Sequence, residues 1–184
     1  MILPMYIFGQ PVLRKQAEEI SADYPDLQKL ISDMIETMKN AEGVGLAAPQ
    51  IGLPIRLVVV DLDVLKDEYP EYEGFLKAYI NPQILEYSEE TCSIEEGCLS
   101  VPGIHESVRR PEKIHITYLD KNLQPHDEWA EGFLARVLQH EFDHLEGKMF
   151  VDRLTPLRKQ MVKKKLMAMA KGKFQCNYKH KPNH

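Results

Sequence analysis

The clearest hydrophobic pattern in the chain lies in residues 25–41. Apolar side chains recur there at i, i+3, i+4, i+7, i+8 and i+11, which is the spacing of one face of an α-helix. They are Leu27, Leu30, Ile31, Met34, Ile35 and Met38. Pro25 suits the first turn of such a helix, and we expect Gly43 to end it. The pattern therefore predicts an amphipathic helix with its methionines in the core.

Strand patterns follow along the chain. Runs that are rich in β-branched residues, or that alternate between apolar and polar residues, predict three strands: 55–61, 78–85 and 113–120. A turn signal at Lys121 and Asn122 predicts that residues 113–130 form a hairpin. Residues 62–77 are acidic and mixed in character, and we expect a surface loop there, with room for a helical turn.

Two further helices are expected, at about 130–146 and at 156–171. Five apolar residues supply the buried face of the first of these helices: Phe133, Leu134, Val137, Leu138 and Leu145. The predicted strands are grouped together and bracketed by helices, rather than alternating with them. This order predicts an α+β fold with mainly antiparallel sheets packed around the central helix.

Composition sets the broad class of the protein. The chain has 184 residues, of which 43% are hydrophobic and 28% charged, as is ordinary for a soluble globular protein. We expect a single domain over residues 1–184. No apolar run reaches the length of a membrane span, and the N-terminus lacks the pattern of a signal peptide. Three widely spaced cysteines do not suggest a disulfide framework. We therefore expect a cytoplasmic monomer that does not bind a membrane.

Candidate chemistry is concentrated in one motif of the central helix, H-E-x-x-H, formed by His140, Glu141 and His144. Residues four apart on a helix are offset by about 40° and share one face, so both imidazoles can bind one metal ion. Glu141 lies beside the same face, where it can reach a water bound to that metal. A catalytic site of this kind needs a third protein ligand and one open position.

The third ligand is expected upstream of the motif. Phe150 stands where one class of H-E-x-x-H protease has its last histidine, and no Asp or Glu follows Asp152. His180 and His184 lie at the C-terminal end, where chains are commonly loose. These observations turn the search toward the segments before the motif.

Cys98 is the strongest upstream candidate, because a thiolate is a good ligand and small residues flank it in a segment that we expect to be extended. Cys92 and Cys176 are interpreted as small buried hydrophobic residues. Another unusual segment, Gly43–Gly52, is rich in glycine and small residues, and read alone it predicts a tight turn rather than a site. Gln50 adds a carbonyl and an amide donor to that segment.

Three stretches together resemble the peptide deformylase family, and their order and rough separation match that family as well: Gly43–Gln50, Glu96–Ser100 and Gln139–His144. The similarity extends from about Leu13 to about Leu157, whereas residues 62–77 resemble an insertion and residues 153–184 are less typical. H-E-x-x-H alone is only moderately specific. Its combination with E-G-C-L-S and G-x-G-L-A-A-x-Q makes chance agreement very improbable.

The resemblance implies an activity and a metal site. The family removes the N-formyl group from the initiator methionine of new bacterial-type peptides. By the matching positions, Cys98, His140 and His144 hold the metal. The resemblance favours Fe²⁺ as the native ion, with Zn²⁺ or Ni²⁺ also able to occupy the site.

The resemblance also implies roles for five further residues. Glu141 acts as general base and then delivers its proton to the leaving amine. The oxyanion meets the metal, the backbone N–H of Leu99 and the side-chain amide of Gln50. Gly45 matches a position where the backbone binds the peptide as an added strand. Val44 and the motif helix contribute to an apolar pocket for the methionine side chain.

Two other functions are compatible with parts of the sequence. A metalloendopeptidase shares the H-E-x-x-H motif, although Cys98 in place of the usual third ligand argues against it. A non-catalytic, metal-stabilised binding module would use the same three ligands. Structural zinc sites usually have four protein ligands, and Glu141 exceeds what such a site needs.

Residues 153–184 are strongly basic, with ten of the 23 Lys and Arg residues and none of the 28 acidic residues. Part of this region is expected to be helical, with loosely periodic apolar residues: Leu157, Met161, Leu166 and Met169. One interpretation is a helix docked on the body of the protein with solvated lysines. The other is an electrostatic contact for ribosomal RNA, since basic segments bind nucleic acid through its phosphates.

Overall fold

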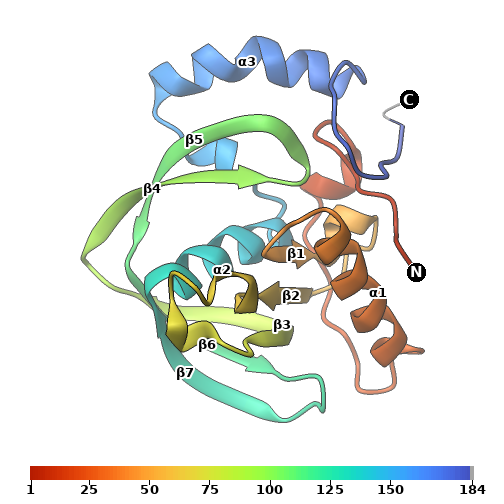
Figure 1. The fold of residues 1–184 in the computed structure, drawn as a ribbon, viewed down its shortest axis with the longest axis vertical. Helices are drawn as coiled ribbons and strands as arrows, with labels where there is room; N and C mark the ends of the chain where they lie inside the picture. The colour runs from red at the N-terminus through yellow and green to blue at the C-terminus, as the bar shows by residue number, and fades with distance from the viewer. Residues whose placement is uncertain (183–184) are drawn as a thin grey trace.

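The computed structural model describes residues 1–182 and has an α+β fold (Figure 1). Its helices are α1 (Leu27–Asn40), α2 (Gly132–Leu145) and α3 (Pro156–Ala170). Its strands are β1 (Gly45–Ala47), β2 (Leu57–Asp61), β3 (Leu76–Tyr87), β4 (Thr91–Cys98), β5 (Val101–Pro111), β6 (Lys113–Leu119) and β7 (Pro125–Glu131). The predicted fold class, the three predicted helices and the predicted hairpin, now β6 and β7, are confirmed.

Two antiparallel sheets form the β-structure. One has five strands in the order β1-β2-β3-β6-β7, and the other consists of β4 and β5. The long strand β3 joins the two halves of the larger sheet. It pairs with β2 along Leu76–Ile80 and with β6 from Ile80 to Tyr87, with register shifts in the second part. Strand β1 lies at the edge of this sheet, with β2 as its neighbour on one side.

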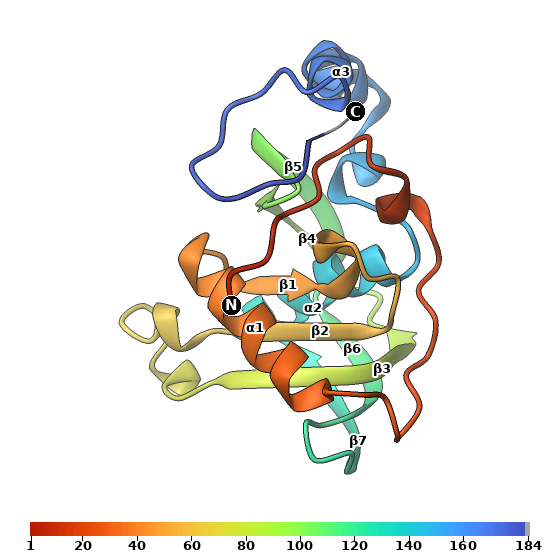
Figure 2. The same cartoon turned by 90° about the vertical axis from the view of Figure 1, so that its right-hand side faces the viewer.

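Strand β2 is buried on both faces, because helices cover it from two sides (Figure 2). Leu57 and Val59 belong to a core cluster that includes the apolar face of α1. Val58 and Val60 alternate with them and belong to a second cluster that includes residues of α2. A continuous β-branched run is typical of such a strand, which explains why the sequence predicted it well.

The end of α1 differs from the prediction. The helix ends at Asn40, and the residue with a positive φ is Glu42, at 58°. Gly43 N donates to Met38 O at 2.9 Å, but Gly43 does not take a left-handed conformation. Instead, a Cβ at Gly43 would lie 2.8 Å from Leu99 Cδ1. Gly43 is therefore required for close packing against the β4–β5 turn rather than for ending the helix.

The β4–β5 hairpin passes over α2 in Figure 1 and turns at Leu99 and Ser100, where Cys98 pairs with Val101. The sequence indicated an extended segment around Cys98 but not these two long strands.

The segment 62–77 contains short 3-10 turns, as expected of a surface loop, before β3 begins at Leu76. No helix within residues 1–182 is long and apolar enough to cross a membrane.

Helix α3 lies on the outside of the fold (Figure 1), and only some of its apolar side chains pack on the body of the protein. Val162 and Met169 are buried and Leu166 is half-buried, whereas Leu157 and Met161 are 69% and 60% exposed. The helix is therefore docked along a narrow line, and two of the four loosely periodic apolar residues are exposed to solvent.

Candidate functional site

Helix α2 carries the motif histidines into the centre of the fold. Every residue from Ala135 to Leu145 is buried, and His140 and His144 are 8% and 0% exposed. Among the residues expected on its apolar face, Val137, Leu138 and Leu145 are buried, while Phe133 and Leu134 near its start are only half-buried. A helix buried on nearly all sides is unusual for a 14-residue element, and its polar residues must therefore find partners.

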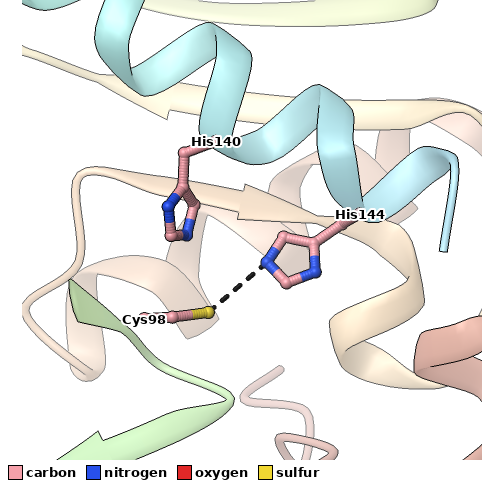
Figure 3. Close-up of side chains that lie close together, drawn as sticks. All are labelled: Cys98, His140 and His144. Carbon is pink, nitrogen blue, oxygen red and sulfur yellow. Dashed lines mark hydrogen bonds between the residues drawn. The ribbon is translucent and has the colours of Figure 1, made fainter. Parts of the chain in front are cut away.

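Cys98 faces the two histidines from the β4–β5 turn (Figure 3). Its Sγ lies 3.4 Å from His144 Nε2, and one ligand atom from each of Cys98, His140 and His144 lies within 4.8 Å of the others. Within residues 1–182 this is the one group of His, Cys, Asp or Glu residues able to hold a metal ion. The three residues proposed from the sequence are thus brought together.

His180 differs from what the sequence indicated. His180 is not loose: it forms a parallel β-bridge with Met5, away from the Cys-His-His group. His184 lies outside the described residues. His180 therefore does not supply the third ligand, and Cys98 is the third member of the group, as expected.

Gln50 holds the Cys98 turn in place. Its side chain is 1% exposed, and its Nε2 donates to Ser100 Oγ at 3.1 Å and to Cys98 Sγ at 3.4 Å. Gln50 Oε1 accepts from Ala47 N at 3.0 Å. The glycine-rich segment is therefore part of the site, through the short strand β1 and the 3-10 turn Ala48–Ile51, and is more than the tight turn that the segment predicted when read alone.

Glu96 orients His140 and was missed by sequence reasoning. Glu96 Oε1 lies 2.8 Å from His140 Nδ1, and the carboxylate also accepts from Arg110 at 2.6 and 3.0 Å and from Arg136 at 2.8 Å. All four residues are buried. Burial opposes the charge of Glu96, but hydrogen bonds from His140 and Arg110 lower its pKa to about 2. A carboxylate that holds Nδ1 directs Nε2 of the same ring toward Cys98 and fixes the tautomer.

A second carboxylate extends this network. Asp143 lies inside the H-E-x-x-H motif and accepts from Arg110 at 2.9 Å and from Arg153 at 2.6 and 2.7 Å. Its partners are 33 and 10 residues away in sequence, so no local pattern could have identified them. The only sequence signal for Glu96 was its place beside Cys98 in E-G-C-L-S.

Glu141 stands apart from these ion pairs. Its Oε1 is buried and has no hydrogen-bond partner within residues 1–182, and burial raises the pKa of Glu141 to about 7. A Cβ at Gly45 would lie 2.6 Å from Glu141 Oε2, so only glycine at that position leaves the carboxylate where it is. The geometry thus presents one unpaired carboxylate oxygen next to the Cys-His-His group.

The donor set fits a divalent transition metal. Burial lowers the pKa of His144 to about 3, so its ring is neutral, as a metal ligand must be. Its Nδ1 has no hydrogen-bond partner among the described residues. A thiolate and two imidazoles are the ligands that iron, zinc and nickel accept. With three protein ligands, a fourth position remains for a small molecule.

Cys98, His140 and Glu141 line a cavity of about 890 Å³. Val44, Gly45, Gln50 and Leu99 all line it, so every residue expected to bind substrate or stabilise charge is at the site. Val44 is half-buried, and Gly45 begins the edge strand β1. An edge strand offers free N–H and C=O groups to an extended peptide.

Gln139 lies on α2, is 3% exposed and donates to the carbonyls of Pro111 and Ala135 at 2.9 and 3.1 Å. Cys92 and Cys176 are half-buried rather than fully buried. Cys92 lies near Arg136, whose guanidinium donates to the Cys92 carbonyl at 2.9 Å.

Comparisons with known proteins agree with the geometry. The polypeptide deformylase family matches residues 2–160. A peptide deformylase of Flavobacterium psychrophilum is 47% identical over 188 residues, which covers 98% of this chain and 97% of the relative. The crystal structure of a peptide deformylase from Legionella pneumophila has a TM-score of 0.81 at 39% identity and covers 96% of this chain and 100% of the other. The peptide deformylase from Thermotoga maritima has a TM-score of 0.76 at 42% identity, covering 85% and 99%.

Proposed function

The chain belongs to the polypeptide deformylase family, which removes the N-formyl group from the N-terminal methionine of new proteins, and we propose how its own residues do so. One observation carries the proposal. Cys98, His140 and His144 converge to form one ligand group. Cys98 and His140 line the same cavity as Glu141, which has an unpaired oxygen, and Gly45 at the start of the edge strand β1 lines it too. A metalloendopeptidase and a structural metal module, which share parts of the motif, are not favoured by the family match. The whole chain, residues 1–184, is proposed to act as one domain.

We infer that Cys98, His140 and His144 are the metal ligands. Fe²⁺ is the proposed native ion, with Zn²⁺ or Ni²⁺ as alternatives that the same donor set accepts. When bound, the ion supplies Lewis-acid activation of water and of the formyl oxygen. Glu96 holds the His140 ring through Nδ1, so the ligand enters the site already oriented.

Glu141 is the proposed general base. Glu141 is not one of the three ligand residues, and its Oε1 is buried with no hydrogen-bond partner in the described part of the chain, so this oxygen can bind a water. It takes the proton from the water that attacks the formyl carbon, and it delivers that proton to the amine nitrogen as the C–N bond breaks. Gly45 permits this position because it has no side chain to displace the carboxylate.

Leu99 and Gln50 are proposed to stabilise the oxyanion. The Leu99 backbone N–H follows Cys98 in the turn, next to the metal ligand. Gln50 Nε2 donates to Ser100 Oγ at 3.1 Å and to Cys98 Sγ at 3.4 Å. Its amide group therefore lies beside the ligand Cys98, where an N–H can turn to the developing negative charge.

The peptide is proposed to bind as an added strand along β1. Gly45 pairs with Val60 of β2 on one side, and the other side of β1 faces the cavity. The methionine side chain then enters the apolar part of the cavity, to which Val44 and, from α2, Val137 contribute. Main-chain hydrogen bonds supply affinity for any peptide, and this pocket supplies the preference for methionine.

We further propose that the chain is a cytoplasmic monomer that associates with ribosomes through its basic C-terminal region, residues 153–184, to which α3 belongs. Three consecutive lysines of α3 are exposed to solvent: Lys163, Lys164 and Lys165. Buried Val162 and Met169 dock the helix on the body of the protein. The three lysines are therefore held at the surface, where they can bind the phosphates of ribosomal RNA.

An anaerobic assay with metal analysis on the same sample tests the proposed function. We expect formate release from a formyl-Met peptide in proportion to bound metal, and no cleavage of the same peptide without its formyl group. Cleavage of internal peptide bonds would show a metalloendopeptidase instead. A fully metal-loaded protein that releases no formate would show a binding module.

A further inference from the structure

The C-terminal segment, residues 171–182, is a docked element rather than a loose end. After α3 it runs back beside the N-terminal segment (Figure 2). Met5 N donates to Lys179 O at 2.9 Å, and Lys181 N donates to Met5 O at 2.8 Å. Two of its aromatic side chains pack against the hydrophobic core: Phe174 and Tyr178. The backbone of this segment is therefore held in one place relative to the site.

Tyr178 joins this segment to the turn that carries Cys98. Its O–H donates to the Leu99 carbonyl at 2.5 Å. Burial raises the pKa of Tyr178, so the hydroxyl remains a donor at neutral pH. From the other end of the chain, Phe8 N donates to Ser100 O at 2.8 Å. The carbonyls of both turn residues are thus held by the two ends of the chain.

The residues just before Tyr178 reach the substrate cavity. Gln175, Cys176 and Asn177 line the same cavity as His140 and Glu141. Gln175 and Asn177 are exposed on it and carry amide donors and acceptors but no charge. Such side chains complement the peptide bonds of a substrate. The match to the family model ends at residue 160, so this part of the cavity is formed by residues that the family model does not include.

We propose that Gln175–Tyr178 forms a wall of the peptide-binding cleft, a role that rests on the proposed function. Gln175 and Asn177 contact the residues that follow the formylmethionine. Tyr178 is a positioning residue, because it does not touch the reacting atoms but fixes the carbonyl of Leu99. Holding that carbonyl limits rotation of the Leu99 backbone, and so keeps its N–H aimed at the oxyanion.

Tyr178→Phe tests the positioning role, because it removes one hydroxyl and keeps the ring packed. We expect kcat to fall about three- to tenfold, the effect of one hydrogen bond, with KM and metal content unchanged. Tyr87→Phe, at a 57% exposed tyrosine of β3, is the matched control and should behave as wild type. A kcat equal to that of the control, or a loss of metal together with kcat, would overturn the positioning role.

The double variant Gln175→Ala/Asn177→Ala tests the wall. Both side chains are exposed, so the substitutions do not disturb the core. We expect KM for a formyl-Met tetrapeptide to rise about three- to tenfold, while kcat/KM for formyl-Met amide, which has no following residues, stays unchanged. Lys179→Ala, on the same segment but outside the cavity lining, is the control. Equal changes of the kinetic constants for both substrates, or no change for either, would contradict the role of Gln175–Tyr178 as a wall of the cleft.

These measurements separate the inference from the function on which it rests. All of them are ratios to the wild-type rate with the same substrate. Absence of formate release by the metal-loaded wild type contradicts the proposed function. Normal wild-type release with unchanged ratios in both variants contradicts only the role of the C-terminal segment.

Discussion

The network around Glu96 and the exposed face of α3 both consist of charged side chains, but their charges are paired in different ways. Glu96 is buried among Arg110, Arg136 and His140, with a hydrogen bond to each. The lysines of α3, by contrast, point into solvent. A buried charge must be matched almost completely to be tolerated, whereas an exposed charge needs no partner in the protein.

This difference shows where each region is sensitive to change. In the buried network one substitution leaves several partners unpaired, so stability and the orientation of His140 are affected together. On α3 a substitution changes the electrostatic field and little else.

Cys98→Ser should have the largest effect, because serine is a poor ligand for a transition metal and the site then retains only two histidines. We expect bound metal and deformylation to be lost together, as measured by metal analysis and formate release. Cys92→Ser is the matched control, since Cys92 lies in the same strand, β4, but outside the ligand group. Retained metal in the Cys98 variant would show that the wrong cysteine was assigned.

Glu96→Gln should be the most destabilising of the remaining changes. Its neutral amide leaves two buried arginines without their shared carboxylate, which we expect to cost about 3–5 kcal/mol in the free energy of unfolding. Glu131→Gln breaks an exposed pair with Lys113 and should cost less than about 1 kcal/mol. Denaturant unfolding measures both values. Similar losses of stability in the two variants would contradict the difference between buried and exposed ion pairs.

Gly45→Ala should reduce turnover with a smaller effect on stability. The new methyl group would meet Glu141 Oε2 at 2.6 Å and must displace that carboxylate. We expect kcat to fall at least about tenfold, because small displacements of a catalytic group have large effects. At Gly74 a Cβ meets open space at a positive φ, so Gly74→Ala should cost about 1 kcal/mol of stability and leave kcat unchanged. A normal kcat in the Gly45 variant would show that a side chain at position 45 does not displace the catalytic carboxylate of Glu141.

Reversing the charges of Lys163, Lys164 and Lys165 to Glu should have the smallest effect on the folded enzyme. Each exposed site should change stability by less than about 0.5 kcal/mol, and turnover of short peptides should be unchanged. Ribosome binding at low salt should weaken by about tenfold or more. The control carries the same net charge change at exposed lysines elsewhere: Lys15, Lys39 and Lys121. Equal ribosome binding by the two variants would refute the role of α3.

The contrast also explains how much the sequence could predict. Helix α1 and strand β2 follow from local apolar patterns, because each packs one or both faces on the core. The β4–β5 hairpin was missed because its buried position 96 is a glutamate, which conceals the usual alternation. Its partners lie 14 and 40 residues away in sequence, and only the fold brings them together.

The sequence predicted the site residues that spacing or resemblance identifies. It missed the residues whose role depends on burial or on the docking of a distant segment. His140 and His144 follow from helical spacing, and Cys98 follows from the search for a third ligand upstream of the motif, which the family resemblance supports. The ends of chains are commonly loose, which gave no reason to place Tyr178 at the Cys98 turn. Its docking depends on packing against the N-terminal segment, which no local pattern records.

Glu141→Gln, with metal content and formate release measured on the same anaerobic sample, tests the central claim most directly. Glu141 is a base and not a ligand, so the variant should bind as much metal as the wild type. Its turnover should fall by about 10²–10⁴-fold, the usual effect of removing a general base. A metal-loaded variant with near wild-type turnover would contradict the account.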